Sequence, residues 1–215
     1  MTVAGPAITI DQLTSWLRRF NDLVIKNQAE LTELDSAIGD ADHGINMARG
    51  MSAVINKLAG DHPAHVNELF KTVAMTLVTS VGGASGPLYG TFFLRFAGAA
   101  GPATELDAEA LDMALRAGLS GIVERGKAAT GDKTMVDALS PALDAMETVI
   151  KNGGDLVAAV VAARDAAAAG RDGTVPLVAR KGRASYLGER SAGHMDPGAA
   201  SMSLLFDALS TELGR

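Results

Sequence analysis

Residues 10–24, IDQLTSWLRRFNDLV, repeat apolar side chains at a spacing of three to four through Leu13, Leu17, Phe20 and Val24. This spacing is typical of one face of an amphipathic α-helix. Val, Ile and Thr at alternate positions, which would indicate strands, are missing, so no sheet is expected. The sequence therefore predicts an all-α fold. Segments with the same helical pattern, each bounded by Gly, Pro or Asn-Gly, cover residues 27–38, 47–58, 65–81, 87–99, 107–126, 134–151, 155–170 and 198–213.

The composition limits the possible functions. The 215 residues are 47% apolar and 20% charged, enough to bury one sizeable core, so a single domain over residues 1–215 is expected. A net charge of −6 without a run of Lys or Arg argues against a nucleic-acid partner. The lack of Cys excludes disulfides and thiolate zinc sites. Neither the N-terminal MTVAGPAITID nor the apolar region 73–100 resembles a signal peptide or a spanning helix, so we expect a cytoplasmic protein with no membrane partner.

Four glycine-containing segments interrupt the helical pattern, at residues 39–44, 82–90, 126–134 and 171–198. Such loops, and the helix N-termini that follow them, expose backbone N–H groups that can bind phosphate. We therefore expect the functional site to lie in these four segments.

Three carboxylates fall close together in residues 34–44, LDSAIGDADHG. Asp35 lies at the expected end of a helix, and Asp40 and Asp42 are alternate residues of the loop that follows. Carboxylates this close repel one another unless a cation joins them, and hard oxygen ligands favour Mg²⁺ over zinc. An EF-hand is excluded because Ile45 stands where that loop requires Gly. The alternative is that the aspartates only cap helices and turns on a solvated loop.

Two further segments have motif-like spacing. In residues 81–87, VGGASGP, the N–H groups of Ala84 and Ser85 could face a ligand, although a tight turn would need these glycines for geometry alone. Acyl transfer by Ser85 is disfavoured because no strand precedes it and a proline interrupts the Gly-x-Ser-x-Gly pattern. Residues 121–128, GIVERGKA, nearly match a P-loop, but Ala128 stands where Ser or Thr is required.

The C-terminal loop carries several polar residues. Residues 182–199, GRASYLGERSAGHMDPGA, are too long for a simple connection and are typical of a lid or binding loop. Arg183 can pair with phosphate, and Asp196 begins the last helix as an acidic N-cap. His194 is interpreted as a hydrogen-bonded structural residue rather than a catalytic one. Met135, which follows the polar loop GDKT, is a core residue by periodicity alone.

Taken together, the segments LDSAIGDADHGINMARG, GGASGPLYG, GDKTMVDAL and GRASYLGERSAGHMDPGA resemble the nucleotide-binding L-subunit family of bacterial dihydroxyacetone kinases. They follow that family's order from Leu34 to Ala199. The resemblance implies an antiparallel eight-helix barrel with the nucleotide in the loops at one end. It also implies a phosphotransferase that uses tightly bound ADP or ATP with two Mg²⁺ ions to phosphorylate dihydroxyacetone or a related small ketose.

The resemblance further implies roles for individual residues. Asp35, Asp40 and Asp42 would hold the Mg²⁺ ions and act with Arg183 in catalysis. The family commonly has Gly where this chain has Ala41, and a residue other than Gly disfavours a positive φ there. The residues expected to contact the nucleotide are His43, Gly44, Ile45 and Asn46 at the phosphates, Ala84 and Ser85 at a phosphate or the ribose, Gly126 and Met135 at adenine, and Arg183, Asp196, Pro197 and Gly198 at the closing side of the pocket.

This family works in two modes. In one, a long chain joins the domain to a sugar-binding domain and exchanges ATP. In the other, a separate subunit keeps ADP that a phosphotransferase-system protein rephosphorylates in place. One barrel would fill 215 residues, so we expect the second mode, with a sugar-binding kinase subunit that holds the ketose and a phosphotransferase-system phosphoryl donor subunit as partners. The alternatives are a separate nucleotide domain of an ATP-exchanging kinase, a non-catalytic nucleotide-binding regulatory module, and a Mg²⁺-dependent phosphohydrolase.

Overall fold

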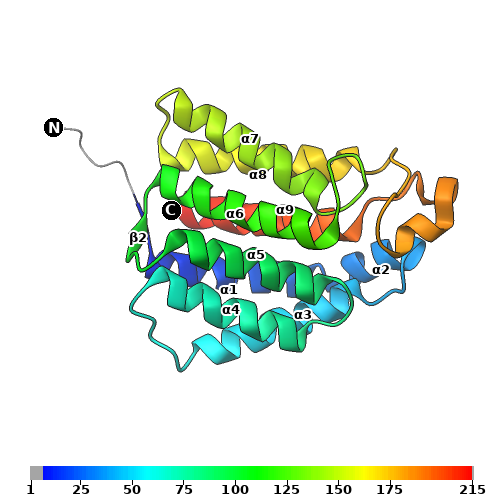
Figure 1. The fold of residues 1–215 in the computed structure, drawn as a ribbon. Coiled ribbons are helices and arrows are strands. Elements are labelled where there is room, and N and C mark those ends of the chain that lie inside the picture. Colours follow the sequence, from blue (N-terminus) through cyan, green and yellow to red (C-terminus); the bar gives the residue numbers. More distant parts are fainter. Residues whose placement is uncertain (1–6, 215) are drawn as a thin grey trace.

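The computed structural model describes residues 7–214, in which nearly all of the regular secondary structure is helical (Figure 1). The predicted all-α class is confirmed. Within residues 7–214, no helix is both long and apolar enough to span a membrane. The N-terminal segment in which no signal peptide is expected lies partly outside the described residues. The elements in chain order are β1 (Ile8–Thr9), α1 (Ile10–Lys26), α2 (Gln28–Ile38), α3 (His43–Leu58), α4 (Val66–Ser80), α5 (Ser85–Ala100), β2 (Glu105–Leu106), α6 (Ala108–Gly126), α7 (Val136–Lys151), α8 (Leu156–Gly173), the 3₁₀ helix η1 (Arg183–Ser191) and α9 (Pro197–Leu213).

Eight of the described helices pack in an order that closes on itself. Helix α1 packs on α3, and each helix from α3 to α8 packs on the next one along the chain. Helix α9 then packs on both α8 and α1. The remaining helix, α2, lies against α3 and η1 at one end (Figure 1). The predicted eight-helix barrel requires such a closed order, and the details of that barrel remain a prediction.

An aromatic cluster fixes α1 against α4, α5 and α9. Trp16 of α1 is fully buried, and its Nε1–H donates to the carbonyl of Leu205 in α9 at 2.8 Å. Its ring centroid lies 5.9 Å from that of Phe70 and 6.3 Å from that of Phe96. Buried aromatic rings contribute large apolar areas and prefer tilted contacts of this kind. The face of α1 that the sequence predicts as apolar is thus the face that is buried.

The alanine-rich segment 157–169 forms the middle of α8, as predicted. Its small buried side chains include Ala159, Ala163 and Ala167, and the helix packs on α7 and α9. Alanine has the highest helix propensity and allows close approach between helices. The low sequence complexity here therefore indicates a tightly packed helix.

The expectation that the chain has no sheet is wrong in one place. Ile8 pairs with Leu106, and Thr9 with Glu105, in an antiparallel ladder of two-residue strands, β1 and β2. Strands of two residues are too short to show the alternating pattern by which strands are predicted. This ladder lies at the end of the molecule opposite to α2 (Figure 1).

Several boundaries between loop and helix also differ from the prediction. Residues 43–44 begin α3, residues 85–90 belong to α5, Gly126 ends α6 and residues 171–173 end α8. Glycine at these places favours a loop when only the sequence is considered, but helices tolerate it near their ends. The loops of the candidate site are therefore residues 39–42, 81–84, 127–135 and 174–196.

These four loops lie at the same end of the molecule (Figure 1). Helices α3, α5, α7 and α9 begin there, whereas α2, α4, α6 and α8 end there. Helix N-termini carry unpaired N–H groups and a partial positive charge. The fold thus directs four such N-termini toward one end. We call residues 127–135 the α6–α7 loop and residues 174–196, which contain η1, the strap.

Candidate functional site

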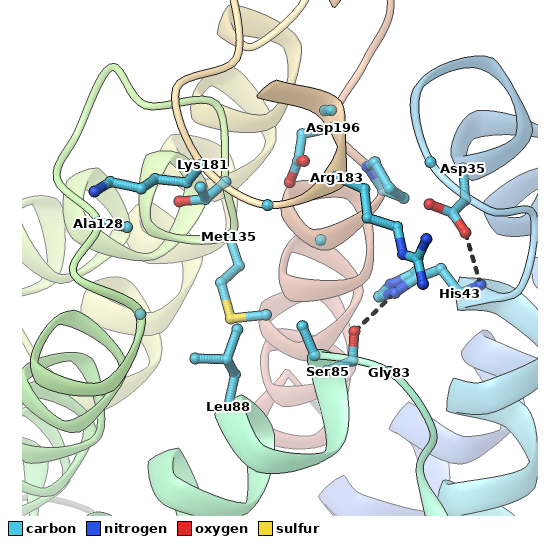
Figure 2. A pocket seen from close by; sticks show the side chains of 18 of the residues that line it. Asp35, His43, Gly83, Ser85, Leu88, Ala128, Met135, Lys181, Arg183 and Asp196 are labelled. Carbon is cyan, nitrogen blue, oxygen red and sulfur yellow. Dashed lines mark hydrogen bonds between the residues drawn. The ribbon is translucent and has the colours of Figure 1, made fainter. Parts of the chain in front are cut away.

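A cavity of about 410 Å³ opens at this end of the molecule and is lined by residues from all four loops. One side of the cavity is acidic and contains Asp35, Asp40 and Asp42, whereas the other is apolar and contains Leu88 and Met135. Figure 2 shows Met135 directed toward Leu88 on one side, with Asp35 and His43 on the other. The volume is within the range of small-molecule sites.

The three aspartates lie close together in the structure, as their spacing in the sequence predicts. Asp35 is buried in the last turn of α2, and Asp40 and Asp42 come from the loop that follows. Each offers a carboxylate oxygen that lies within 4.8 Å of the others. Oxygen donors without nitrogen or sulfur match the preference of Mg²⁺, so the residues present fit this ion.

Asp35 also caps the next helix. Its Oδ2 accepts hydrogen bonds from the backbone N–H groups of Asp42 at 2.8 Å and His43 at 3.1 Å, at the start of α3. A Cβ on Gly39 would lie 2.0 Å from Asp35 Oδ1, so this close approach requires glycine. The alternative interpretation, in which the aspartates only cap helices, therefore holds for one oxygen of Asp35. In the described part of the chain, the carboxylates of Asp40 and Asp42 cap no helix.

Ala41, between the second and third aspartates, has a φ of 61°. It thus adopts the left-handed conformation that its side chain disfavours, and the three carboxylates still converge. This conformation costs an L-residue about 1–2 kcal/mol. Replacing Ala41 by glycine would remove this cost, but the greater flexibility of glycine in the unfolded chain would offset part of the gain in stability.

Ala41→Gly is therefore expected to raise the free energy of unfolding by about 0.5–1 kcal/mol. Urea denaturation of the ligand-free protein measures this change. The matched control is Ala169→Gly in α8, where an exposed helical alanine should lose about 1 kcal/mol. A less stable Ala41→Gly protein would contradict the strain inferred at this position.

Arg183, the first residue of η1, reaches the acidic side from the strap. Its Nη2 lies 3.0 Å from Oδ2 of Asp40, and its side chain is 69% exposed. Figure 2 shows the guanidinium on the side of the cavity that carries Asp35 and His43. The strap therefore places a planar set of donors beside the carboxylates, at the side of the cavity where the sequence analysis expects phosphate.

A buried hydrogen-bond chain fixes the start of α5. His43 Nδ1 lies 3.0 Å from Ser85 Oγ (Figure 2), and its Nε2 lies 2.9 Å from Ser201 Oγ. Ser201 in turn contacts the hydroxyl of Tyr89 at 2.8 Å. Burial lowers the pKa of His43, against the opposing effect of Asp35 and Asp42, so the imidazole is neutral at pH 7.

The start of α5 has unused donors. In residues 7–214, the backbone N–H groups of Ala84, Ser85 and Gly86 donate no hydrogen bond. They belong to the first turn of the helix, where the partial positive charge of the helix dipole is concentrated. These three N–H groups form a surface that suits an anion.

The other side of the cavity is apolar. It is formed by Leu88 of α5, Ile122 of α6 and Met135 at the start of α7, with Gly126 and Ala128 at the edge. In Figure 2, Lys181 of the strap extends toward Ala128.

Asp196 closes the cavity at the start of α9. Its Oδ2 accepts a hydrogen bond from the N–H of Ala199 at 2.7 Å, as predicted for an N-cap. Burial raises the pKa of Asp196 to about 7, and the carboxylates of Asp137 and Asp35 act in the same direction. The carboxyl group therefore holds a proton in the folded protein at pH values where an unfolded aspartate is ionised.

This difference predicts how stability depends on pH. Between about pH 4 and pH 7 the unfolded chain has released the Asp196 proton and the folded chain has kept it, so the contribution of Asp196 to stability falls as pH rises and is lost above pH 7. Asp196→Asn keeps the cap without this titration. Relative to wild type, its free energy of unfolding should therefore increase from pH 5 to pH 8, by more than about 1 kcal/mol.

Urea denaturation at pH 5, 6, 7 and 8 tests this prediction. Asp155→Asn is the matched control, because Asp155 caps α8 in the same way, with Oδ1 at 2.8 Å from the N–H of Ala158, but is exposed. A constant difference between wild type and Asp196→Asn across these pH values would contradict the raised pKa.

Not all expected site residues line the cavity. Gly44 is buried where a Cβ would lie 2.1 Å from the carbonyl oxygen of Gln28 in α2, and Ile45 is 48% exposed. The Oδ1 of Asn46 accepts a hydrogen bond from Arg49 at 2.7 Å. The prediction of a hydrogen-bonded His194 is wrong for its side chain, which is exposed and makes no hydrogen bond in the described residues.

The other expected residues line the cavity, and some lining residues were not predicted. Leu88 and Ile122 have the same periodicity as core residues, so nothing in the sequence separates them from the core. Lys133 and Lys181 lie in polar loops, and their charge is the signal that could have identified them. The expected residues that line the cavity are Asp35, Asp40, Asp42, His43, Ala84, Ser85, Gly126, Met135, Arg183, Asp196, Pro197 and Gly198.

Comparisons with known proteins point to one family. The sequence model of the DAK2 domain matches residues 37–211. The chain is 48% identical over 204 residues to "PEP-dependent dihydroxyacetone kinase 1, ADP-binding subunit DhaL" of Listeria innocua serovar 6a, with 94% of this chain and 97% of that protein covered. It is 44% identical over 199 residues to the PEP-dependent dihydroxyacetone kinase ADP-binding subunit DhaL of Escherichia coli strain K12, with 93% and 95% covered.

A solved structure also matches. The dihydroxyacetone kinase from C. freundii in complex with AMP-PNP and Mg²⁺ aligns with a TM-score of 0.71 at 27% identity. The alignment covers 98% of this chain and 35% of that kinase. This chain thus spans about a third of the length of the C. freundii enzyme.

Proposed function

The chain belongs to the DAK2 domain family, and on that premise we propose that it is the nucleotide-binding subunit of a dihydroxyacetone kinase. It binds ADP or ATP with Mg²⁺ and transfers a phosphoryl group to dihydroxyacetone or a related small ketose that a separate subunit holds. The bound ADP is rephosphorylated in place by a phosphotransferase-system donor. The relatives that match over nearly their full length are PEP-dependent kinase subunits, which supports this mode over ATP exchange.

One observation carries the proposal: three carboxylates within 4.8 Å of one another line the same cavity as the start of α5, where the N–H groups of Ala84 and Ser85 donate no hydrogen bond in residues 7–214. Asp35, Asp40 and Asp42 would hold two Mg²⁺ ions, which neutralise phosphate charge when bound. The N–H groups of Ala84 and Ser85 suit phosphate oxygens. Because phosphoryl transfer depends on positioning and charge neutralisation, the site needs no protein nucleophile.

The remaining residues position the nucleotide. Leu88, Ile122 and Met135 form an apolar surface against which the base packs. Arg183 can donate two parallel hydrogen bonds to phosphate oxygens. In the transfer, a hydroxyl oxygen of the ketose forms the new bond to phosphorus, the bond from phosphorus to the ADP oxygen breaks, and groups of the sugar-binding subunit accept the hydroxyl proton.

Reconstitution tests the proposed function. The protein is mixed with a sugar-binding kinase subunit, a phosphotransferase-system donor, phosphoenolpyruvate and dihydroxyacetone, and the ketose phosphate is measured. We expect product only when both partners are present, and expect it to persist when glucose and hexokinase remove free ATP. Product that requires added ATP and stops with this trap would indicate an exchanging kinase. Bound nucleotide without product would indicate a regulatory module, and nucleotide hydrolysis without ketose a phosphohydrolase.

A further inference from the structure

Lys133 is a fully buried lysine in the α6–α7 loop, with 1% of its surface exposed. Its Nζ donates to the backbone carbonyls of Thr174 at 2.9 Å and Leu177 at 3.1 Å, and also to that of His194. A fourth carbonyl, of Val175, lies at 3.4 Å. These carbonyls belong to the first residues of the strap and to a residue near its end. One ammonium group therefore joins both ends of the strap to the α6–α7 loop.

The backbone of the α6–α7 loop directs Lys133 inward. Lys133 has a φ of 63°, a left-handed conformation that persists only where the surroundings fix it. The surroundings here are the buried carboxylate of Asp137, which accepts hydrogen bonds from the N–H groups of Gly131 and Thr134, and the carbonyl of Asp132, which accepts one from Arg180 in the strap. The loop thus holds a disfavoured conformation that sends the ammonium group into the strap.

The ends of the strap are held differently from its middle. The middle rests on α2 through a small apolar cluster of Ile38, Ala179 and Ala184. At the ends, the N–H of Gly193 donates to the carbonyl of Val175 at 2.8 Å, and the N–H of Asp196 donates to Thr174 Oγ1 at 3.0 Å. These two bonds lie beside the carbonyls that contact Lys133. Without the ammonium group, the carbonyls of Leu177 and His194 would keep no hydrogen-bond partner among residues 7–214, whereas those of Thr174 and Val175 would each keep one backbone N–H.

The strap carries Arg183 to the acidic side of the cavity and places Asp196 in the cavity lining, whereas the α6–α7 loop ends at Met135 on the apolar side. We propose that Lys133 is a positioning residue: it fastens the strap to the α6–α7 loop, and so sets where Arg183 stands relative to the apolar side of the site. The part of this proposal that concerns nucleotide binding rests on the proposed function, whereas the fastening of the strap does not.

Hydrogen exchange of the ligand-free protein tests the fastening. Lys133→Met keeps a long unbranched side chain but removes the N–H donors. In this variant the amides of Leu177, Gly193 and Asp196 should exchange at least about tenfold faster, because losing a hydrogen bond to a charged group lowers the free energy of local opening by an amount that corresponds to about this factor or more. Amides of α4 and α5 should be unchanged. The control is Lys127→Met, since Lys127 is also left-handed (φ 51°) but exposed and outside the cavity lining. Unchanged exchange at the strap ends in Lys133→Met would overturn the proposal.

A double-mutant cycle tests the positioning of Arg183 separately from stability. Arg183→Gln should weaken Mg²⁺·ADP binding about tenfold in the otherwise wild-type protein. In the Lys133→Met background the same change should weaken it less than about twofold, because Arg183 is already misplaced. If Arg183→Gln weakens Mg²⁺·ADP binding by the same factor in both backgrounds, Lys133 only stabilises the fold and does not position Arg183.

Two further outcomes are distinguished. If Lys133→Met does not fold, both measurements are made on Lys133→Gln, which keeps an amide donor. Smaller changes of the same sign are then expected. If neither measurement changes, the proposal is overturned. If the wild-type protein binds no Mg²⁺·ADP, the proposed function fails, and the exchange experiment still decides whether Lys133 fastens the strap.

Discussion

Asp42→Asn should lower the affinity for Mg²⁺·ADP by about 100-fold or more, because loss of a direct ligand should exceed the roughly 10- to 100-fold effects of changing groups that only hydrogen-bond to a ligand. The purified variant should then retain no nucleotide. Asparagine keeps the shape of the side chain but removes the charge that a Mg²⁺ ligand supplies. Of the three aspartates, Asp42 is the best position for this test because its carboxylate has no second structural role within the described part of the chain. Asp35 also caps α3, and Asp40 also pairs with Arg183.

The helical fold should survive this change, since the Asp42 carboxylate caps no helix in residues 7–214. Nucleotide and Mg²⁺ per chain are measured by acid extraction and metal analysis, and helix content by circular dichroism. Asp11→Asn is the matched control, with the same loss of charge on an exposed residue of α1. If Asp42→Asn retains ADP and supports turnover, Asp42 is not a metal ligand.

Arg183→Lys should slow phosphoryl transfer about tenfold or more while the ligand-free protein keeps its thermal stability. Lysine preserves the charge but not the planar pair of donors that matches phosphate oxygens. Stability should not change because the ion pair with Asp40 is largely exposed, and exposed pairs contribute little.

The transfer rate is measured in the reconstituted mixture, and thermal stability by calorimetry. Arg190→Lys is the control, since Arg190 is exposed at the other end of η1 and does not line the cavity. Equal transfer rates for Arg183→Lys and wild type would remove Arg183 from the site.

The helices could be predicted because each one buries a single face. The spacing of Leu13, Leu17 and Phe20 reports that face directly, and so does the run of small residues in α8. The aspartate cluster could be predicted because its members lie within eight residues of one another. Helix starts were less accurate, since His43 begins α3 inside a segment that reads as a loop.

Contacts between distant segments could not be predicted from one sequence. His43 meets Ser201 across 158 positions, and Lys133 meets His194 across 61. The local sequence around His43 or Lys133 does not indicate the partner of either residue, because periodicity shows which residues are buried and not which buried groups contact each other. The apolar side of the cavity was missed for the same reason: Leu88 and Ile122 follow the helical period of the core.

The nucleotide content of the purified protein shows whether ADP stays bound in the site. The protein is desalted without added nucleotide, precipitated with acid, and its extract is separated by nucleotide chromatography. We predict close to one ADP per chain with Mg²⁺, and loss of both after treatment with a chelator, because a cofactor that is rephosphorylated in place need not leave the site. A well-folded protein that emerges without nucleotide and binds ADP only at millimolar concentration would show that ADP is not a permanently bound cofactor.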